Sequence, residues 1–246
     1  MSPQGLAIEN YRGRRVPRTI GLWLAGAAGV STALIAILGG HVPSSGWGAL
    51  AGTLLVFVAG LADDLRPAGP RGLGNHLRAL ASGQVTTGIV KVIVTVGASV
   101  VVIALEPVRS GAVALAGVAL VAATANVWNG LDVRPGRALK FGLIAMLALV
   151  GIDVVLLPTL PGVTLAAALA LPADLRERAM LGDGGSNLLG FTIGLGLYLV
   201  LPGWGVALGA AIAVSLNVVA DTVTFSRAID AVRPLRWFDR LGRLPE

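Results

Sequence analysis

The chain has 246 residues, of which 55% are hydrophobic, 13% are charged and 34 are glycine. A soluble domain carries roughly a quarter charged residues, so this composition excludes an ordinary soluble protein and indicates a helical protein that crosses a membrane repeatedly. With no cysteine and only two histidines, the chain lacks the side chains for a disulfide or a typical zinc site. The net charge of +6 would suggest nucleic acid as the partner of a soluble protein. In a membrane protein arginines mark the cytoplasmic loops instead, so we expect no nucleic-acid partner.

Eight apolar segments approach the roughly 20 residues that a helix needs to span a bilayer. The sequence therefore predicts an all-α fold, in which residues 1–246 form one integral membrane domain with about eight transmembrane helices. In chain order the predicted segments are Thr19–Gly40, Trp47–Ala62, Val85–Leu105, Ser110–Val127, Leu139–Leu157, Thr159–Leu171, Asn187–Leu201 and Gly203–Phe225. The short sixth segment decides on which side of the membrane all later residues lie.

Basic residues indicate the side of the membrane on which each loop lies. Apart from Lys91, within a segment, and Arg109, every lysine and arginine falls on the side shared by both ends of the chain. Because basic loops stay in the cytoplasm, we expect a multi-pass protein of the cytoplasmic (cell) membrane with both termini inside. Residues 1–18 then form a basic N-terminus and residues 227–246 a basic amphipathic C-terminus, whose Trp237 and Phe238 lie on the inner leaflet.

Three polar clusters lie at the ends of predicted segments, all on the expected cytoplasmic face: Asp63-Asp64, Asn126–Asp132 and Gly182–Ser186. Hydrocarbon cannot solvate carboxylates, so acids in such positions are usually functional. Asp63 and Asp64 repel each other and need a compensating cation or water. A plain solvated helix end remains the alternative for this pair.

The second cluster places Asn126, Asn129 and Asp132 three residues apart, which puts them along one stripe of a helix. Capping or packing is the alternative for these polar side chains. The Gly182–Ser186 cluster is expected to form a loop before a helix that starts near Asn187. Its glycines and free helix amides favour a phosphate, whereas a simple turn capped by Ser186 is the alternative.

The ligands available in these clusters are hard oxygen atoms, without thiol or imidazole. Such ligands favour Mg²⁺, with Mn²⁺ as the second choice, and Mg²⁺ commonly binds one or two carboxylates together with substrate phosphates. Asp183 is the expected ligand, and the arginine-rich loops are expected to contact the phosphates.

The order Gly-Leu-Ala-Asp-Asp (60–64), Asn-x-x-Asn-x-x-Asp (126–132) and Gly-Asp-Gly-Gly-Ser (182–186) resembles the polyprenyl-phosphate N-acetylhexosamine-1-phosphate transferase family. This family, of glycosyltransferase 4 type, includes phospho-N-acetylmuramoyl-pentapeptide transferase. The resemblance implies a phosphoglycosyl transferase of cell-envelope (cell wall) glycan biosynthesis. Its members transfer a sugar 1-phosphate from a UDP-sugar to polyprenyl (undecaprenyl) phosphate with Mg²⁺ and release UMP. A homodimer is a further family expectation.

The resemblance and the chemistry of the clusters together give the candidate site. The expected catalytic residues are Asp63, Asp64 and Asp132, and the expected metal ligand is Asp183. The expected substrate-binding residues are Asn126, Asn129, Arg14, Arg15, Gly184, Ser186, Arg134 and Arg137.

The chain also departs from the family pattern. We expect it to begin after the family's first span; its second motif is contracted, and no histidine-rich loop follows His76. Arginines among residues 227–243 are an expected substitute for that loop as diphosphate contacts.

Two other classes of function stay open. A cation-coupled secondary transporter would use Asp153 and Asp221, which lie in or near spans, although transporter sites usually lie near the midplane. A non-catalytic membrane scaffold would use its acids only to end helices. For Lys91, we expect the ammonium to snorkel toward water, with contact to a lipid phosphate as the alternative.

Overall fold

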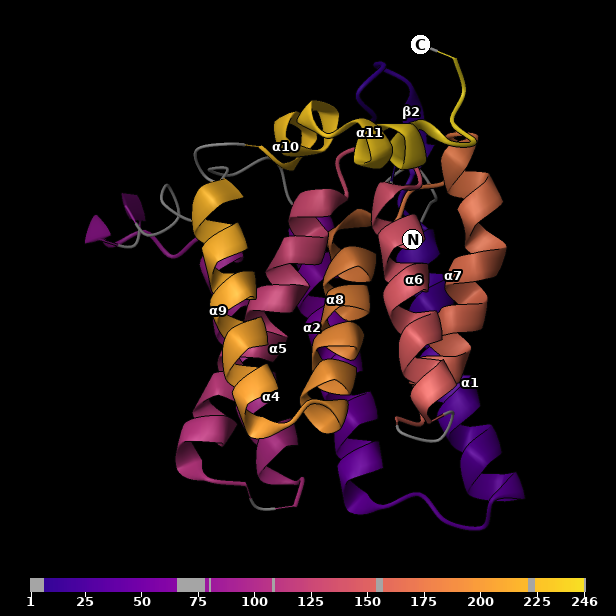
Figure 1. The fold of residues 1–246 in the computed structure, drawn as a ribbon. Coiled ribbons are helices and arrows are strands. Elements are labelled where there is room, and N and C mark those ends of the chain that lie inside the picture. The colour runs from indigo at the N-terminus through magenta and orange to yellow at the C-terminus, as the bar shows by residue number, and fades with distance from the viewer. Residues whose placement is uncertain are drawn as a thin grey trace.

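The computed structural model describes residues 7–65, 78–79, 81–107, 109–153, 157–220 and 224–245. Long helices run side by side, and shorter elements lie across one end of the bundle (Figure 1). The elements are β1 (Ala7–Glu9), β2 (Arg15–Pro17), α1 (Ile20–Leu38), α2 (Ser44–Asp64), α4 (Thr87–Ala104), α5 (Gly111–Leu131), α6 (Arg137–Ile152), α7 (Leu160–Leu175), α8 (Gly182–Val200), α9 (Gly203–Ala220), α10 (Phe225–Ala231) and α11 (Arg233–Arg240).

Each of the eight predicted segments overlaps one long helix of the bundle. Five of these helices, α1, α2, α4, α5 and α9, are long and apolar enough to cross a membrane, and α7 is a shorter apolar helix. The prediction of a helical membrane bundle is therefore confirmed, whereas the number of spans and the side of the termini stay predictions.

The outer surface of the bundle is apolar. Ile37, Leu115 and Trp204 are 75%, 73% and 74% exposed, although each is a large hydrophobic residue on a helix of the candidate spans. Exposed large hydrophobic residues occur on all five of these helices, and an extensive apolar surface marks contact with a membrane or a partner. Together with the helix lengths, it supports a lipid bilayer as the environment of these helices.

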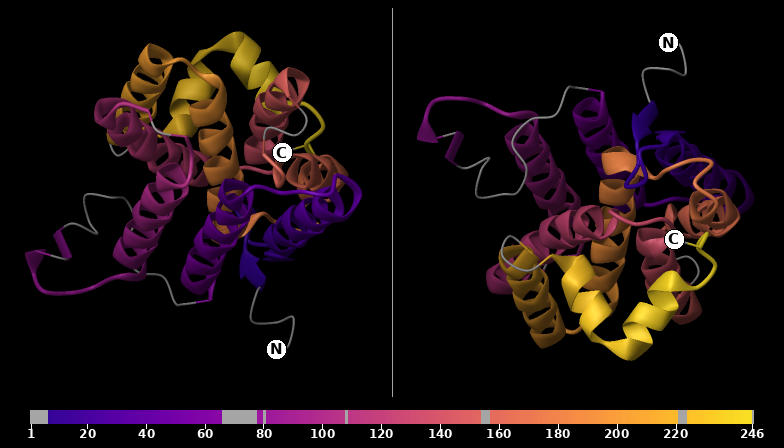
Figure 2. Two further views of the ribbon diagram at one scale, coloured as in Figure 1. Left: turned by 90° about the horizontal axis from the view of Figure 1, so that it is seen from below. Right: turned by 90° about the horizontal axis from the view of Figure 1, so that it is seen from above.

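Helix α8 lies at the centre of the bundle, with α1, α2, α5 and α6 packed around it (Figures 1 and 2). Its glycines allow neighbouring backbones to approach closely: a Cβ on Gly190 would lie 2.6 Å from the Thr124 carbonyl oxygen, and one on Gly194 would lie 2.9 Å from Val121 Cα. Small residues at helix interfaces permit such close packing in membranes.

Two features differ from the sequence predictions. Helix α8 begins at Gly182 and not near Asn187, so Gly182–Ser186 form its first turn instead of a preceding loop. The all-α prediction also missed a short antiparallel hairpin, β1–β2, whose turn is held by Asn10 Oδ1, which accepts from the amides of Arg12 (2.9 Å) and Arg14 (3.0 Å).

The hairpin and the C-terminal helices lie at the same end of the bundle (Figure 1). Arg12 donates to the carbonyl oxygens of Leu244 (3.1 Å) and Pro245 (2.9 Å), which joins the two segments directly.

Candidate functional site

Helices α2 and α5 end, and α8 begins, at one end of the bundle, which we call the acidic end (Figure 1). Gly60 of α2 packs against the first turn of α8 so closely that a Cβ would lie 2.6 Å from the Asp183 carbonyl oxygen and 2.7 Å from Gly184 Cα. On the other side, a Cβ on Gly21 of α1 would lie 2.8 Å from the Gly185 amide nitrogen. This backbone-to-backbone contact fixes Asp183 beside Asp63 and Asp64.

Asp64 caps the N-terminus of α8 from a different helix. Its two carboxylate oxygens accept from the amides of Asp183 and Gly184, each at 3.0 Å, and Arg18 forms an ion pair with it at 2.8 Å. These bonds satisfy helix amides that would otherwise lack a partner. The glycines of this turn predict amides that are free for a phosphate, but Asp64 occupies that position in this structure.

Asp63 points instead toward Lys91 of α4. The Lys91 ammonium donates to Asp63 Oδ2 at 3.2 Å and to Asp183 Oδ2 at 2.6 Å, and the residue is only 8% exposed. The expectation that Lys91 snorkels to water is therefore wrong: its charged end lies between two carboxylates. A lone cation inside an apolar segment is the sequence signal that marks such a residue.

Asn129 of α5 completes this network. With its amide nitrogen toward Ser186 Oγ (2.9 Å) and Asp183 Oδ1 (3.2 Å), its carbonyl oxygen accepts from the Lys91 ammonium at 3.3 Å. Four helices therefore contribute to one cluster of polar side chains, which we call the Lys91 network: Asp63, Lys91, Asn129, Asp183 and Ser186.

The Lys91 network offers oxygen ligands for a hard cation, but only a few. Within the described part of the chain, no three His, Cys, Asp or Glu side chains gather closely enough to hold a metal ion by themselves. Asp63 and Asp183 converge on one cationic group, and two carboxylates completed by substrate phosphates are a usual arrangement for Mg²⁺. The donor set therefore fits Mg²⁺ when phosphate ligands are bound with it.

Asp132 follows α5 directly and contacts the first turn of α8 at Gly182. Burial raises the pKa of its carboxyl well above the ordinary value, and the negative charges of Asp174, Asp183 and Asp64 raise it further. A hydrogen bond from the Gly182 amide acts in the opposite direction. The environment of Asp132 therefore favours the protonated form of its carboxyl.

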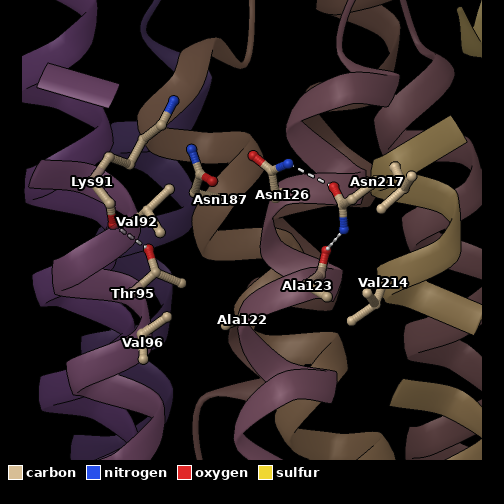
Figure 3. Close-up of a pocket in the computed structure, with 11 residues that line it drawn as sticks. Lys91, Val92, Thr95, Val96, Ala122, Ala123, Asn126, Asn187, Val214 and Asn217 are labelled. Carbon is tan, nitrogen blue, oxygen red and sulfur yellow. Dashed lines mark hydrogen bonds between the residues drawn. The ribbon is translucent and has the colours of Figure 1, made fainter. Parts of the chain in front are cut away.

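A cavity of about 200 Å³ lies beside the Lys91 network, between α4, α5, α8 and α9 (Figure 3). Its walls are mostly apolar, and one end carries Lys91 and Asn187 (Figure 3). Asn126 lines the cavity too and donates to Asn217 Oδ1 at 2.5 Å, while Asn217 donates to the Ala123 carbonyl oxygen at 2.9 Å. Asn217 is not among the residues that the sequence predicts, because a single asparagine in an apolar helix gives no indication of its partner.

The predicted arginines do not gather at the acids. Arg14 and Arg15 lie exposed on the hairpin, and the Arg134 guanidinium lies 4.5 Å from the centre of the Tyr11 ring. Arg137 is buried and binds Asp239 of α11 through two bonds of 2.8 and 2.9 Å. Arg18, which was not predicted, does reach the candidate site through its ion pair with Asp64.

Of the two acids of the transporter hypothesis, one lies within the described residues. Asp153 follows α6 at the end of the bundle opposite the acidic end (Figure 1), and Asp221 lies outside the described residues.

No protein-family model, curated protein or solved structure matches this chain. The family resemblance therefore rests on the three motifs and on the site that they form.

Proposed function

We propose that the protein is a membrane phosphoglycosyl transferase that moves a sugar 1-phosphate from a UDP-sugar to polyprenyl phosphate and releases UMP. In this proposal the acidic end faces the cytoplasm and eight helices cross the membrane. The support is the order of the three motifs together with the contacts that connect them: Asp63 of the first, Asn129 of the second and Asp183 of the third all belong to the Lys91 network.

The observation that carries the proposal is that Lys91 joins the polar network to the apolar cavity. Its ammonium belongs to the Lys91 network, and the same residue lines the apolar cavity (Figure 3). A polyprenyl phosphate has an apolar chain and an anionic head, so its chain fits the apolar walls of the cavity and its head fits the end that carries Lys91. With part of the chain beside Val92, Val96 and Val214, the phosphate would lie at Lys91.

The charges of the network suit an anionic substrate only when a cation is added. Asp63, Asp183 and Lys91 together carry one net negative charge, which repels phosphate. Bound by Asp63 and Asp183, Mg²⁺ (or Mn²⁺) would make the total positive and stabilise the charge on the diphosphate. The net charge of these three residues is therefore the reason why the proposed reaction would need a metal ion.

The proposed reaction is attack by an oxygen of the lipid phosphate on the β-phosphorus of the UDP-sugar. A new P–O bond forms, the bond between the β-phosphorus and the bridging oxygen breaks, and UMP leaves with that oxygen. Because a phosphate monoester is largely ionised at neutral pH, positioning by Lys91 and Asn129 contributes more than removal of a proton. Asp64 holds the first turn of α8 in place, and Asp132 borders that turn at Gly182.

Release of UMP tests the proposal. The purified protein in nanodiscs is incubated with undecaprenyl phosphate, Mg²⁺ and a panel of UDP-sugars. We expect UMP only when both substrates and Mg²⁺ are present. Asp183→Asn should abolish its release, because an amide is a far poorer ligand for Mg²⁺. Asp153→Asn, an acid at the opposite end, is the matched control and should retain activity.

A folded wild-type protein that releases no UMP from any UDP-sugar would contradict the proposal. Transport that depends on Asp153 would then favour the transporter, and an inactive protein without transport would favour the scaffold.

A further inference from the structure

Helices α10 and α11 cross the acidic end along the perimeter of the bundle, from the end of α9 toward α6 (Figure 2). Residues 224–245 contain five arginines and two aspartates. One of these aspartates, Asp239, is buried against Arg137 of α6, so the exposed surface of this segment is predominantly positive.

One face of α11 combines this positive charge with apolar surface. Arg233, Trp237 and Arg240 follow one another at positions i, i+4 and i+7, which share a helix face. All three are exposed, and Trp237 is 67% exposed. Tryptophan is enriched where protein surfaces meet the headgroups of a bilayer, and arginines beside it are typical of helices that lie in the membrane interface.

The opposite face of α11 is fastened to the start of α6. Besides the Arg137–Asp239 pair, the Lys140 ammonium donates to the carbonyl oxygens of Phe238 (2.7 Å), Asp239 (2.6 Å) and Leu241 (3.0 Å). Lys140 therefore caps the C-terminal end of α11, where a cation is favourable.

The C-terminal segment also holds the loop between α5 and α6. Arg243 forms an ion pair with Asp239 and donates to the Pro135 carbonyl oxygen at 2.9 Å. This loop begins with Asp132, directly after α5. The position of α11 is therefore linked by direct bonds to the loop that carries Asp132.

We propose that the Arg233–Trp237–Arg240 face binds anionic phospholipid headgroups at the membrane surface, and that this binding orders the loop of residues 132–136. Charge and position identify the occupant: the face is cationic and aromatic, and its segment follows α9, the last candidate span, in the chain. Each arginine near an anionic surface favours binding by about fivefold. In a neutral bilayer the face loses this attraction, and the loop is held by the contacts to α11 alone.

Fluorescence quenching tests the binding. The chain has five tryptophans, so the signal of Trp237 is the difference between wild type and Trp237→Phe in nanodiscs that contain brominated lipid. We expect brominated phosphatidylglycerol to quench Trp237 more than brominated phosphatidylcholine does at equal mole fraction. The double change Arg233→Gln/Arg240→Gln should remove the preference, whereas Arg176→Gln/Arg178→Gln, an equal charge loss at exposed positions, should retain it.

Hydrogen exchange in the same nanodiscs tests the link to the loop. The amides of Asp132, Val133, Arg134 and Gly136 should exchange at least about threefold more slowly in phosphatidylglycerol than in phosphatidylcholine. This factor is smaller than the gain in lipid binding expected from two arginines. The difference should vanish in Arg233→Gln/Arg240→Gln. Equal quenching of Trp237 by the two lipids overturns the binding, and a lipid preference without a change in exchange overturns the link. Neither measurement uses transferase activity, so both decide the inference independently of the proposed function.

Discussion

Gly60→Ala should destabilise the protein, because it forces two backbones apart at the acidic end. A Cβ at this position would lie 2.6 Å from the Asp183 carbonyl oxygen and 2.7 Å from Gly184 Cα. Both contacts involve backbone atoms, which cannot rotate away as a side chain does. Overpacking of this kind costs about 1–3 kcal/mol. At roughly 2–4 °C per kcal/mol, the midpoint of thermal unfolding should fall by about 2–12 °C.

The matched control is Gly26→Ala in α1, where an added Cβ meets no atom within 4 Å. Alanine is favoured over glycine in a helix by about 1 kcal/mol, so the control should unfold at the wild-type temperature or slightly above it. Unfolding of both variants is followed in detergent by the circular dichroism of the helices. Equal midpoints for Gly60→Ala and Gly26→Ala would refute the close packing of α2 against α8.

The same structure makes three more predictions. Asp239→Asn leaves the buried Arg137 charge without its carboxylate partner and should lower the free energy of unfolding by about 3–5 kcal/mol. The control, Asp230→Asn at an exposed position, should change it by less than about 1 kcal/mol. Chemical denaturation measures both. Because its folded-state pKa is raised, Asp132 contributes stability at low pH that is lost as pH rises from near 3.8 through the folded pKa. Asp132→Asn should therefore gain stability relative to wild type over that pH range, and a constant difference in unfolding midpoint across pH would contradict the raised pKa. Single cysteines at exposed Ser44 and Arg178, in a chain without native cysteine, should label from opposite sides of the membrane; labelling from the same side would remove the proposed arrangement of the spans.

The positions of the helices were predictable because a span needs a long apolar run, and each of the eight runs became a helix. The start of α8 was not predictable in the same way. The cap that allows helix to begin at Gly182 comes from Asp64, which is distant in the sequence. A local pattern of glycines indicates a turn, and only the packing of α2 against α8 shows that it continues as helix.

The candidate site was predictable in its acids but not in their separate contacts. Adjacent Asp63 and Asp64 were assigned one catalytic role, yet they lie 100° apart around a helix and therefore face different neighbours. Asp63 contacts Lys91, whereas Asp64 contacts Arg18 and α8. The choice between these partners depends on which helices lie beside α2, and a single sequence does not contain that information.

Arg137 shows the same limit for a basic residue. Its place in a loop after α5 suggested a phosphate contact, but Asp239 of α11 binds it instead. The two residues are far apart in the chain, and neither gives a sign of the other.

Transfer of the β-phosphate of a UDP-sugar tests the central claim most directly. The protein in nanodiscs receives undecaprenyl phosphate, Mg²⁺ and a UDP-sugar that carries ³²P at the β-phosphate, and the products are separated into lipid and water phases. We expect the label to move with the sugar into the lipid phase and the released UMP to be unlabelled. With Asp183→Asn or Lys91→Met, the label should stay in the water phase. Labelled nucleotide alone in the water phase, without labelled lipid from an active wild-type preparation, would contradict the central claim.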